Sequence, residues 1–578
     1  MRAYLPLLLV LACVVSWGGT ISGRVFLDAN DDGLYQATEE AVAGALVSDG
    51  LTIVVSGADG RYSLESPEGE QVVFVVNPSG TWFPRGFSRL VQVGPAEADF
   101  PLVRQEQKVP FCFVQGTDLH IRPEIADKMA RYVAAVNALP LPVAFVVHTG
   151  DLVVDSTMAT VAADARALFA KYKEMVAGLK APLINLPGNH EHVSVGRPEV
   201  SPDSPGWGKA TYRELFGPTY FAFNYAGVSF LALDGTDIVN GKGVYGIPAQ
   251  CLAWVKAYLD RLPMDARLVL LIHEPITSLP QRAELEKMLQ GRKVIVGLCG
   301  HGHGIASWPF AGTTEIMGGT TSYAWHGSGY GPNPLGYHVV RITDTGYEDA
   351  FGDWATRYSI AVQQPQRTST LTAGVRVEGQ ILDPAEDVKS VELKWGTSQR
   401  TITSFATQGL ARTFSADLEA AALPDGFHDL TLTAYGKGEP EVERQPFLVV
   451  TGKTEPSPLD QPVKLRLRLR NVNAADVVTV NGKEVGKADA AQKGQTLSLQ
   501  VAPADLKRLN LVEVTAAKAA DGSWDQFEVD GVEMLSGGKS TYDYRRAKYS
   551  ALQVRTTGTQ PGKGSWYLDL QRPDDYAQ

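Results

Sequence analysis

The stretch Val-Ile-Val-Gly-Leu-Cys-Gly-His-Gly-His at residues 294–303 joins a continuous apolar run to two closely spaced histidines. A short apolar run of this kind is typical of a strand that is buried on both faces. The histidines would then lie at the carboxyl end of a strand, where open α/β sheets build their sites. The same arrangement, an apolar run followed by polar residues, occurs at four other places in the chain.

These four places contain further residue types that bind metal ions. The whole chain has only ten histidines, and five of them fall in the five motifs. The other motifs, with the apolar runs before them, are Asp118-Leu119-His120 after 109–114, Gly150-Asp151 after 143–147, Gly188-Asn189-His190-Glu191 after 182–186, and His273 after 268–272. Helical patterns lie between the runs, at 123–139, 157–179 and 248–262. The alternation predicts a layered α/β domain over residues 106–360.

The order Asp-x-His, Gly-Asp, Gly-Asn-His-Glu, His, Gly-His-x-His resembles that of the calcineurin-like metallophosphoesterases. The resemblance implies a β-sandwich flanked by helices and a dinuclear metal centre, at which a metal-bound hydroxide attacks a phosphate ester. Nitrogen and oxygen ligands suit manganese, zinc, iron or cobalt. By resemblance, one metal ion takes Asp118, His120 and His303, the other takes Asn189, His273 and His301, and Asp151 bridges the two.

His190 has a different role in this family resemblance. The histidine of Gly-Asn-His is not a ligand there, but stabilises the transition state and protonates the leaving alkoxide. Many members orient it with an aspartate three positions after the bridging one, where this chain has Val154. The nearest aspartate is Asp155, and the sequence leaves open whether it orients His190 or is a solvated loop residue.

The resemblance favours a phosphodiesterase, with a phosphomonoesterase acting on nucleotides or sugar phosphates as the alternative. A catalytically inactive surface-binding protein is less favoured, because no expected ligand is missing. Purple acid phosphatases add a tyrosine ligand after Gly-Asp, in the region where this chain has Val154, so that branch is disfavoured. Two segments around the site, 192–210 with Trp207 and Lys209, and 320–336 with several aromatic residues, would select the substrate.

Composition limits the architecture and the partners. A chain of 578 residues predicts roughly three to five domains. The net charge of −11 and the lack of a long basic run disfavour nucleic acid duplexes as partners. The family resemblance implies a small phosphate-ester substrate instead.

The N-terminus is typical of an export signal. Arg2 precedes an apolar run at 5–15 that is too short to span a bilayer, so residues 1–18 are expected to be a signal peptide. The protein would then be periplasmic or extracellular. Residues 10–13 also resemble a lipobox loosely, which would make Cys13 a lipid attachment site. The remaining cysteines, Cys112, Cys251 and Cys299, are expected to be buried free thiols.

Short strand-like runs with glycine punctuation predict a β-sandwich module at residues 19–105. Its segment 28–39 fits the twelve-residue calcium-loop pattern. Asp28, Asn30, Asp32 and Glu39 would donate side-chain oxygens to a structural calcium ion, and Leu34 would donate its backbone carbonyl. The segment resembles the calcium loops of bacterial surface β-sandwich repeats.

After the α/β domain the pattern returns to alternating strands. It predicts a β-sandwich module at 368–452 and, beyond a proline-rich linker, a C-terminal β-rich domain at 460–578. Asn481-Gly482 marks a hairpin turn. Neither unit contains a catalytic constellation, so we expect these modules to position the enzyme, for example at the cell surface or envelope, or to shape its cleft.

Overall fold

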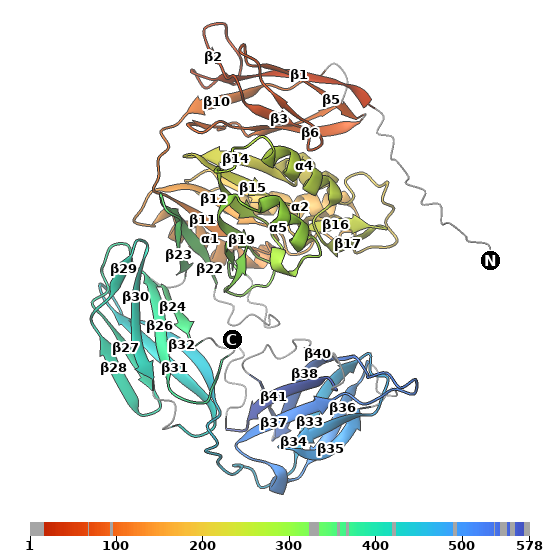
Figure 1. The fold of residues 1–578 in the computed structure, drawn as a ribbon, viewed down its shortest axis with the longest axis vertical. Coiled ribbons are helices and arrows are strands. Elements are labelled where there is room, and N and C mark those ends of the chain that lie inside the picture. Colours follow the sequence, from red (N-terminus) through yellow and green to blue (C-terminus); the bar gives the residue numbers. More distant parts are fainter. Residues whose placement is uncertain are drawn as a thin grey trace, which may run out of the picture.

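The computed structural model describes residues 17–67, 69–92, 96–322, 335–354, 359–365, 369–418, 423–488, 494–536, 538–543, 552–554 and 561–571. Within these residues four β-rich units follow one another along the chain, and the α-helices all lie in the second unit (Figure 1). The expected multidomain fold class, a central layered α/β domain between all-β modules, is confirmed.

The N-terminal module packs two sheets face to face. One sheet has the order β2-β1-β10-β7, with β5 and β9 also paired to β1, and the other has the order β4-β3-β6-β8. The strands are β1 (Trp17–Leu27), β2 (Glu40–Ala41), β3 (Leu46–Ser48), β4 (Ile53–Val55), β5 (Arg61–Pro67), β6 (Glu70–Val76), β7 (Thr81–Trp82), β8 (Ser88–Gln92), β9 (Ala96–Glu97) and β10 (Phe100–Arg104). Buried and exposed residues alternate along β5, because successive side chains of a strand point to opposite faces.

The first sheet of the central domain has the order β13-β12-β11-β22-β23. Its strands are β11 (Phe111–Gly116), β12 (Val143–Thr149), β13 (Leu183–Leu186), β22 (Gly336–Ile342) and β23 (Tyr347–Asp353). Strands β11, β12 and β13 are parallel, whereas β22 and β23 run antiparallel to their neighbours. Two helices, α1 (Ala126–Asn137) and α2 (Ala162–Val176), share a hydrophobic core with this sheet through residues such as Tyr132 and Phe169.

The second sheet has the order β14-β15-β18-β19-β21-β20. Its strands are β14 (Phe221–Tyr225), β15 (Val228–Ala232), β18 (Arg267–Leu271), β19 (Lys293–Cys299), β20 (Ala306–Phe310) and β21 (Thr313–Met317). Phe230 packs against Phe113 and Phe145 of the first sheet with ring centroids 5.4 and 5.2 Å apart, so aromatic residues fill the space between the sheets. The helices α3 (Ala210–Phe216), α4 (Ala249–Leu259) and α5 (Arg282–Leu289) and the hairpin β16 (Thr236–Val239)–β17 (Lys242–Tyr245) complete the domain.

The N-terminal module and the central domain share one hydrophobic core. Trp82 of β7 packs on Phe145, Phe223 and Tyr225, with ring centroids 5.8, 6.2 and 5.9 Å away. The side chains of Asn77 and Asn224 exchange hydrogen bonds with each other's backbone across the same boundary. The module predicted as a separate unit is therefore packed as part of the central domain.

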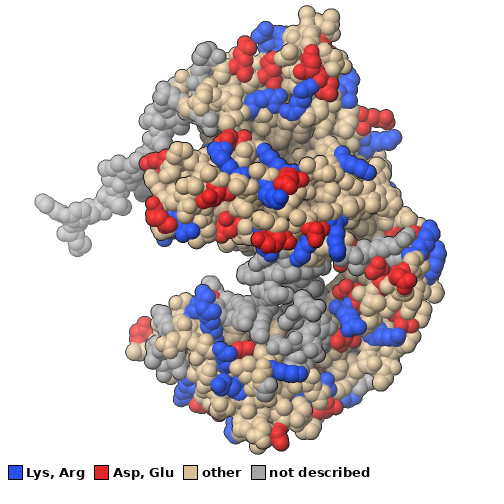
Figure 2. Space-filling model, turned by 180° about the vertical axis from the view of Figure 1, so that it is seen from behind, with Lys and Arg blue, Asp and Glu red and all other residues tan. Residues whose placement is uncertain are grey.

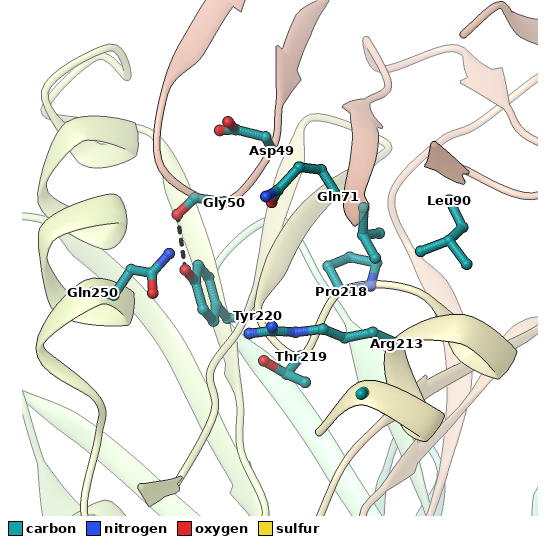
Figure 3. A pocket seen from close by; sticks show the side chains of 11 residues that line it. Asp49, Gly50, Gln71, Leu90, Arg213, Pro218, Thr219, Tyr220 and Gln250 are labelled. Carbon is teal, nitrogen blue, oxygen red and sulfur yellow. Dashed lines mark hydrogen bonds between the residues drawn. The ribbon is translucent and has the colours of Figure 1, made fainter. Parts of the chain in front are cut away.

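A cavity of about 150 Å³ lies at this boundary (Figure 3). The hydroxyl of Tyr220 donates to the carbonyl of Gly50 over 2.8 Å at its edge, and the side chains of Gln71, Arg213 and Gln250 also line it. None of the predicted metal ligands lines this cavity, so it is separate from the site described below.

The third unit pairs the sheets β24-β26-β30-β29 and β25-β32-β31-β27-β28. Its strands are β24 (Ser359–Gln364), β25 (Thr370–Leu371), β26 (Val375–Leu382), β27 (Ser390–Trp395), β28 (Ser398–Ile402), β29 (Ala406–Gln408), β30 (Ala411–Leu418), β31 (Gly426–Tyr435) and β32 (Glu441–Val449). Leu382 and Leu410 pack into the helix-covered core of the central domain.

The fourth unit contains the sheets β36-β33-β38-β39, with β40 paired to β38, and β35-β34-β37-β41. Its strands are β33 (Val463–Arg470), β34 (Asp476–Val480), β35 (Lys483–Ala488), β36 (Thr496–Val501), β37 (Leu509–Thr515), β38 (Phe527–Ser536), β39 (Lys539–Tyr542), β40 (Leu552–Val554) and β41 (Lys563–Asp569). Asn481 and Gly482 turn between β34 and β35 with positive φ angles, which confirms the predicted hairpin turn.

The surface in Figure 2 carries acidic and basic side chains mixed together, with neither sign gathered into one area. Within the described part of the chain, no helix combines the length and the apolar character needed to cross a bilayer.

Candidate metal centre

All five sequence motifs lie at the carboxyl ends of strands that end at the same edge of the two sheets. The residues and the strands they follow are Asp118 and His120 after β11, Asp151 after β12, Asn189 and His190 after β13, His273 after β18, and His301 and His303 after β19. Because these strands run parallel within each sheet, their ends meet and residues far apart in sequence become neighbours.

The backbone at these residues takes an unusual conformation. Asp118, His120, Asp151, His301 and His303 all have positive φ angles, of 51°, 45°, 49°, 69° and 58°. Non-glycine residues rarely adopt this left-handed region, and such strain gathers at functional sites, where the surrounding structure must stabilise it. This conformation therefore occurs where the chain leaves β11, β12 and β19.

Two motif glycines are required by close packing. A Cβ atom on Gly188 would lie 2.3 Å from Asp151 Oδ1, and one on Gly300 would lie 2.0 Å from Thr117 Oγ1. Both distances are far below van der Waals contact. The glycines of Gly-Asn-His and Gly-His-x-His therefore let neighbouring strands bring their polar residues together.

The first cluster of donor atoms comes from Asp118, His120, Asp151 and His303, whose ligand atoms all lie within 4.8 Å of one another. The Nε2 atoms of His120 and His303 are 3.0 Å apart. His303 Nε2 lies 3.2 Å from Asp118 Oδ1, and His120 Nε2 lies 3.7 Å from Asp151 Oδ2. All four residues are buried, and nitrogen and carboxylate donors that converge in this way fit a divalent metal ion.

The second cluster consists of Asp151, His273 and His301, again within 4.8 Å. His273 Nε2 lies 3.2 Å from Asp151 Oδ1, and His301 Nδ1 lies 2.9 Å from Asn189 Oδ1. His273 donates its Nδ1 hydrogen to the Thr149 carbonyl over 2.7 Å, so Nε2 presents a lone pair to the centre when the ring is neutral. Asp151 belongs to both clusters, with one carboxylate oxygen toward each.

Burial and neighbouring charges decide the protonation of the site. Burial lowers the pKa of both His120 and His301 to about 4, so both rings are neutral and able to bind a metal near neutral pH. Burial raises the pKa of Asp151, but His273 and His190 lower it by more, and the net effect is a pKa well below the usual value. The Asp151 carboxylate is therefore ionised.

His190 lies at the opening of the site, where 27% of its side chain is exposed. Its Nδ1 atom donates to the backbone carbonyl of Val154, and its Nε2 atom lies 3.7 Å from Asp151 Oδ2. Burial lowers its pKa, but Asp151, Glu191, Asp155 and the Val154 carbonyl raise it by more. Asp155 itself accepts the backbone N–H of Thr157 over 2.9 Å. The orienting partner of His190 is therefore a backbone carbonyl, which no side-chain motif signals.

Other histidine, lysine and cysteine residues of the domain lie outside the two donor clusters. His148 is buried between the hydroxyls of Tyr132 and Tyr172, at 2.9 and 2.6 Å. His192 is buried as well, so it is not a surface residue. Lys209 does not extend toward the centre but donates to Asp234 and to the carbonyl of Thr236, at 2.6 and 2.7 Å. The three cysteines at 112, 251 and 299 are free and buried, as expected. Residues 323–334, most of the predicted aromatic segment, lie outside the described residues.

The predicted calcium loop lies between β1 and β2. Its carboxylates accept backbone N–H groups: Asp28 from Gly33, Asp32 from Leu34, and Glu39 from Ala29 and Gln36, over 2.8–2.9 Å. The Arg85 Nε atom lies 3.6 Å from Asp28 and 3.3 Å from Asp31. The loop is therefore closed by its own hydrogen bonds and one guanidinium group, and calcium binding stays a prediction.

Comparison with protein families gives one match, to the calcineurin-like phosphoesterase model at residues 113–304. Residues 113–304 form a calcineurin-like phosphoesterase domain. The matched range begins in β11 and ends just after His303, so it contains all five motifs. The domain is that of a metal-dependent phosphoric ester hydrolase, and its buried cluster of aspartate and histidine residues is suited to divalent metal ions.

Solved structures with a weak similarity to the chain include three of interest here. The structure of GAP50, the anchor in the inner membrane complex of Plasmodium, is 14% identical in sequence to this chain. The match covers 43% of this chain and 85% of the GAP50 chain, with a TM-score of 0.30. Phosphopantetheinyl hydrolase from Mycobacterium tuberculosis is 14% identical in sequence. That match covers 36% of this chain and 90% of the hydrolase, with a TM-score of 0.25. A predicted phosphoesterase from Streptococcus pneumoniae is 13% identical in sequence. That match covers 43% of this chain and 91% of the phosphoesterase, with a TM-score of 0.22. No curated protein matches the chain.

Proposed function

We propose that the domain holds two divalent metal ions and hydrolyses phosphodiesters. One metal ion is held by Asp118, His120 and His303, and the other by Asn189, His273 and His301. The observation that carries the proposal is the place of Asp151 in both donor clusters, because a shared carboxylate is what a bridged metal pair requires. The mixed nitrogen and oxygen donors suit manganese, zinc, iron or cobalt.

When bound, the metal pair supplies positive charge that lowers the pKa of water and withdraws charge from the phosphate oxygens. The residues of the chain do the rest. His190 is held by the Val154 carbonyl through Nδ1, which leaves Nε2 at the opening of the site to give a proton to the leaving alkoxide. A histidine suits this role because its ordinary pKa lies close to neutral pH.

The charge of the site supports a diester substrate. Among the described residues, Asp118 and Asp151 form ion pairs only with histidines, and no lysine or arginine joins them. A diester carries one negative charge, whereas a monoester carries up to two near neutral pH. Because these described ion pairs bring no lysine or arginine beside the two carboxylates, they favour the smaller charge of a diester. A phosphomonoesterase acting on nucleotides or sugar phosphates is the alternative.

The test compares bis-p-nitrophenyl phosphate with p-nitrophenyl phosphate, using protein stripped of metal and reloaded with manganese or zinc. We expect turnover that depends on metal and favours the diester. Turnover that favours the monoester would replace the diesterase with the phosphatase alternative. An absence of turnover on both esters, in protein that binds two metal ions per chain, would favour a narrow natural substrate or the inactive binding protein.

We also propose that residues 1–18 direct export and that the β modules associate with the cell surface or envelope. Arg2 and the apolar run at 5–15 support the signal, whereas residues 1–16, including Cys13, lie outside the described residues. Mass spectrometry of the mature protein decides between cleavage after Gly18 and lipidation at Cys13. A protein that keeps residues 1–18 would overturn the proposal.

A further inference from the structure

The hairpin β16–β17 follows directly on β15, at the same edge of the second sheet as His273. Its two strands pair with each other in the register Thr236↔Tyr245 and Asp237↔Val244, and with no other described strand. Residues opposite each other in such a pair point to the same face, and neighbours along a strand point to opposite faces. Tyr245 and Val244 therefore belong to different faces of the hairpin.

Hydrogen bonds hold the two ends of the hairpin next to the candidate metal centre. The hydroxyl of Thr236 donates to Glu274, which directly follows the predicted ligand His273. The amide of Gly246 donates to the carbonyl of Gly235 over 2.8 Å, and Lys209 binds the carbonyl of Thr236 over 2.7 Å. Because both ends of the hairpin are held in this way, Tyr245 keeps a defined position relative to the donor clusters.

Tyr245 contacts one of the predicted ligands. Its ring lies at 73° to the ring of His301, with centroids 4.7 Å apart. At the same time 52% of Tyr245 is exposed to solvent. His190, Asn189 and His301 are themselves partly exposed, whereas Asp118, Asp151 and His273 are buried. The opening of the site is therefore on the side of these partly exposed residues, and an accessible aromatic ring stands next to it.

We propose that Tyr245 determines substrate specificity, by stacking on the base of a nucleoside ester. The inference rests on the proposed function, because the phosphate of that ester must bind at the metal centre. A half-exposed ring fixed beside a charged centre offers an apolar face to the organic part of the ester. Stacking of a base on an aromatic side chain is tolerant of base identity and contributes about 1–3 kcal/mol.

The first test uses two diesters that share the leaving group p-nitrophenol. Thymidine 5′-(p-nitrophenyl phosphate) carries a base, and methyl p-nitrophenyl phosphate does not. Tyr245→Ala should lower kcat/KM for the thymidine ester about tenfold, which corresponds to about 1.4 kcal/mol, and leave the methyl ester within about twofold. Tyr245→Phe, which keeps the ring, should stay close to the wild type on both esters.

Val244→Ala is the matched control, since Val244 is 46% exposed and lies on the other face of the same hairpin. It should affect neither ester. Metal content per chain should be the same in all variants. An equal loss on both esters in Tyr245→Ala would overturn the proposal, because it would show that the ring acts through His301. An unchanged rate on the thymidine ester would overturn it as well.

A binding measurement separates this proposal from the diesterase proposal. Calorimetry on metal-loaded protein compares thymidine 5′-monophosphate with methyl phosphate and needs no turnover. Tyr245→Ala should weaken the binding of the nucleotide about tenfold and leave methyl phosphate unchanged. If wild-type protein hydrolyses neither diester, the proposed function fails, while this binding difference still supports the role of Tyr245. If Tyr245→Ala weakens the binding of both ligands equally, or changes the binding of neither, that role is overturned.

Discussion

The imidazole of His190 is held by the backbone carbonyl of Val154 and not by the carboxylate of Asp155. A carbonyl oxygen can only accept a hydrogen bond, so Nδ1 must carry a hydrogen and the orientation of the ring is determined. The backbone amide of His190 in turn donates to Asp151 Oδ1 over 3.0 Å. The proposed acid and the proposed bridging carboxylate are therefore positioned by one another.

Replacement of His190 should separate rate from metal binding. His190→Ala is expected to lower kcat by about 10²- to 10⁴-fold, because proton transfer to the leaving group is lost, while both metal ions remain. Steady-state kinetics and elemental analysis measure the two effects. Asp155→Asn is the control and should stay within about threefold of the wild type, since Asp155 does not hold the ring. A comparable loss in Asp155→Asn would show that the carboxylate orients His190 after all.

Replacement of Asp151 and replacement of Asn189 should remove different numbers of metal ions. Asp151→Ala is expected to lose both metal ions and all hydrolysis, because its carboxylate belongs to both donor clusters. Asn189→Ala should lose only the second metal ion, since Asn189 Oδ1 lies beside His301 of the second cluster. Elemental analysis after dialysis gives the metal content per chain. Full metal content in an active Asp151→Ala protein is incompatible with the bridged assignment.

The shared core between the N-terminal module and the central domain should make their unfolding cooperative. Trp82→Ala is expected to lower the free energy of unfolding by about 3–5 kcal/mol, because it leaves a cavity among Phe145, Phe223 and Tyr225. Urea unfolding, followed by activity and by fluorescence, measures the change. Leu34→Ala, at a residue 68% exposed, should change it by less than about 0.5 kcal/mol. If Trp82→Ala loses its activity at the same urea concentration as the wild type, the N-terminal module and the central domain unfold independently.

The C-terminal domain contains a buried carboxyl pair that should make its stability depend on pH. Burial and the neighbouring Asp525 together raise the pKa of Asp476 to about 7, although a hydrogen bond from the amide of Ala517 lowers it. The folded state therefore holds a proton that the unfolded state releases near pH 4. The contribution of the Asp476 carboxyl to the free energy of unfolding is therefore fully present below about pH 4. It is lost as the pH rises toward about 7.

Asp476→Asn should remove this dependence, because the amide keeps an acceptor for Ala517 and needs no proton. Its Tm should exceed that of the wild type at pH 8 and differ little at pH 4.5. Differential scanning calorimetry at both pH values measures the shift, with the exposed Asp460→Asn as the control. An equal shift at the two pH values would refute a titrating pair.

Calcium binding at residues 28–39 can be tested on the same instrument. If the loop binds calcium, Tm should rise with calcium concentration and the rise should be absent in Asp32→Ala. Asp31→Asn is the control, since residue 31 is not one of the expected ligands. A Tm that does not respond to calcium would show that the loop is closed by its hydrogen bonds and Arg85 alone.

The sequence alone was sufficient for the strands and the donor residues of the centre. The apolar runs at 143–147 and 294–299 are local patterns, and they became β12 and β19 with shifts of one or two residues at the ends. Metal ligands come from few residue types, so Asp118, His120 and His303 were recognisable before their proximity was known. The hairpin turn at Asn481-Gly482 was also predictable, because positive φ angles favour those residues.

The tertiary structure decided what depends on contacts between distant segments. The carbonyl of Val154 carries no side-chain signal, so only the fold reveals that it holds His190. Tyr245 belongs to no motif and becomes significant through its contact with His301. Trp82 joins a module and a domain that the sequence pattern predicts as two units. The physical reason is the same in each case: periodicity and residue chemistry are local properties of a chain, whereas packing and backbone hydrogen bonds depend on where the whole chain places its atoms.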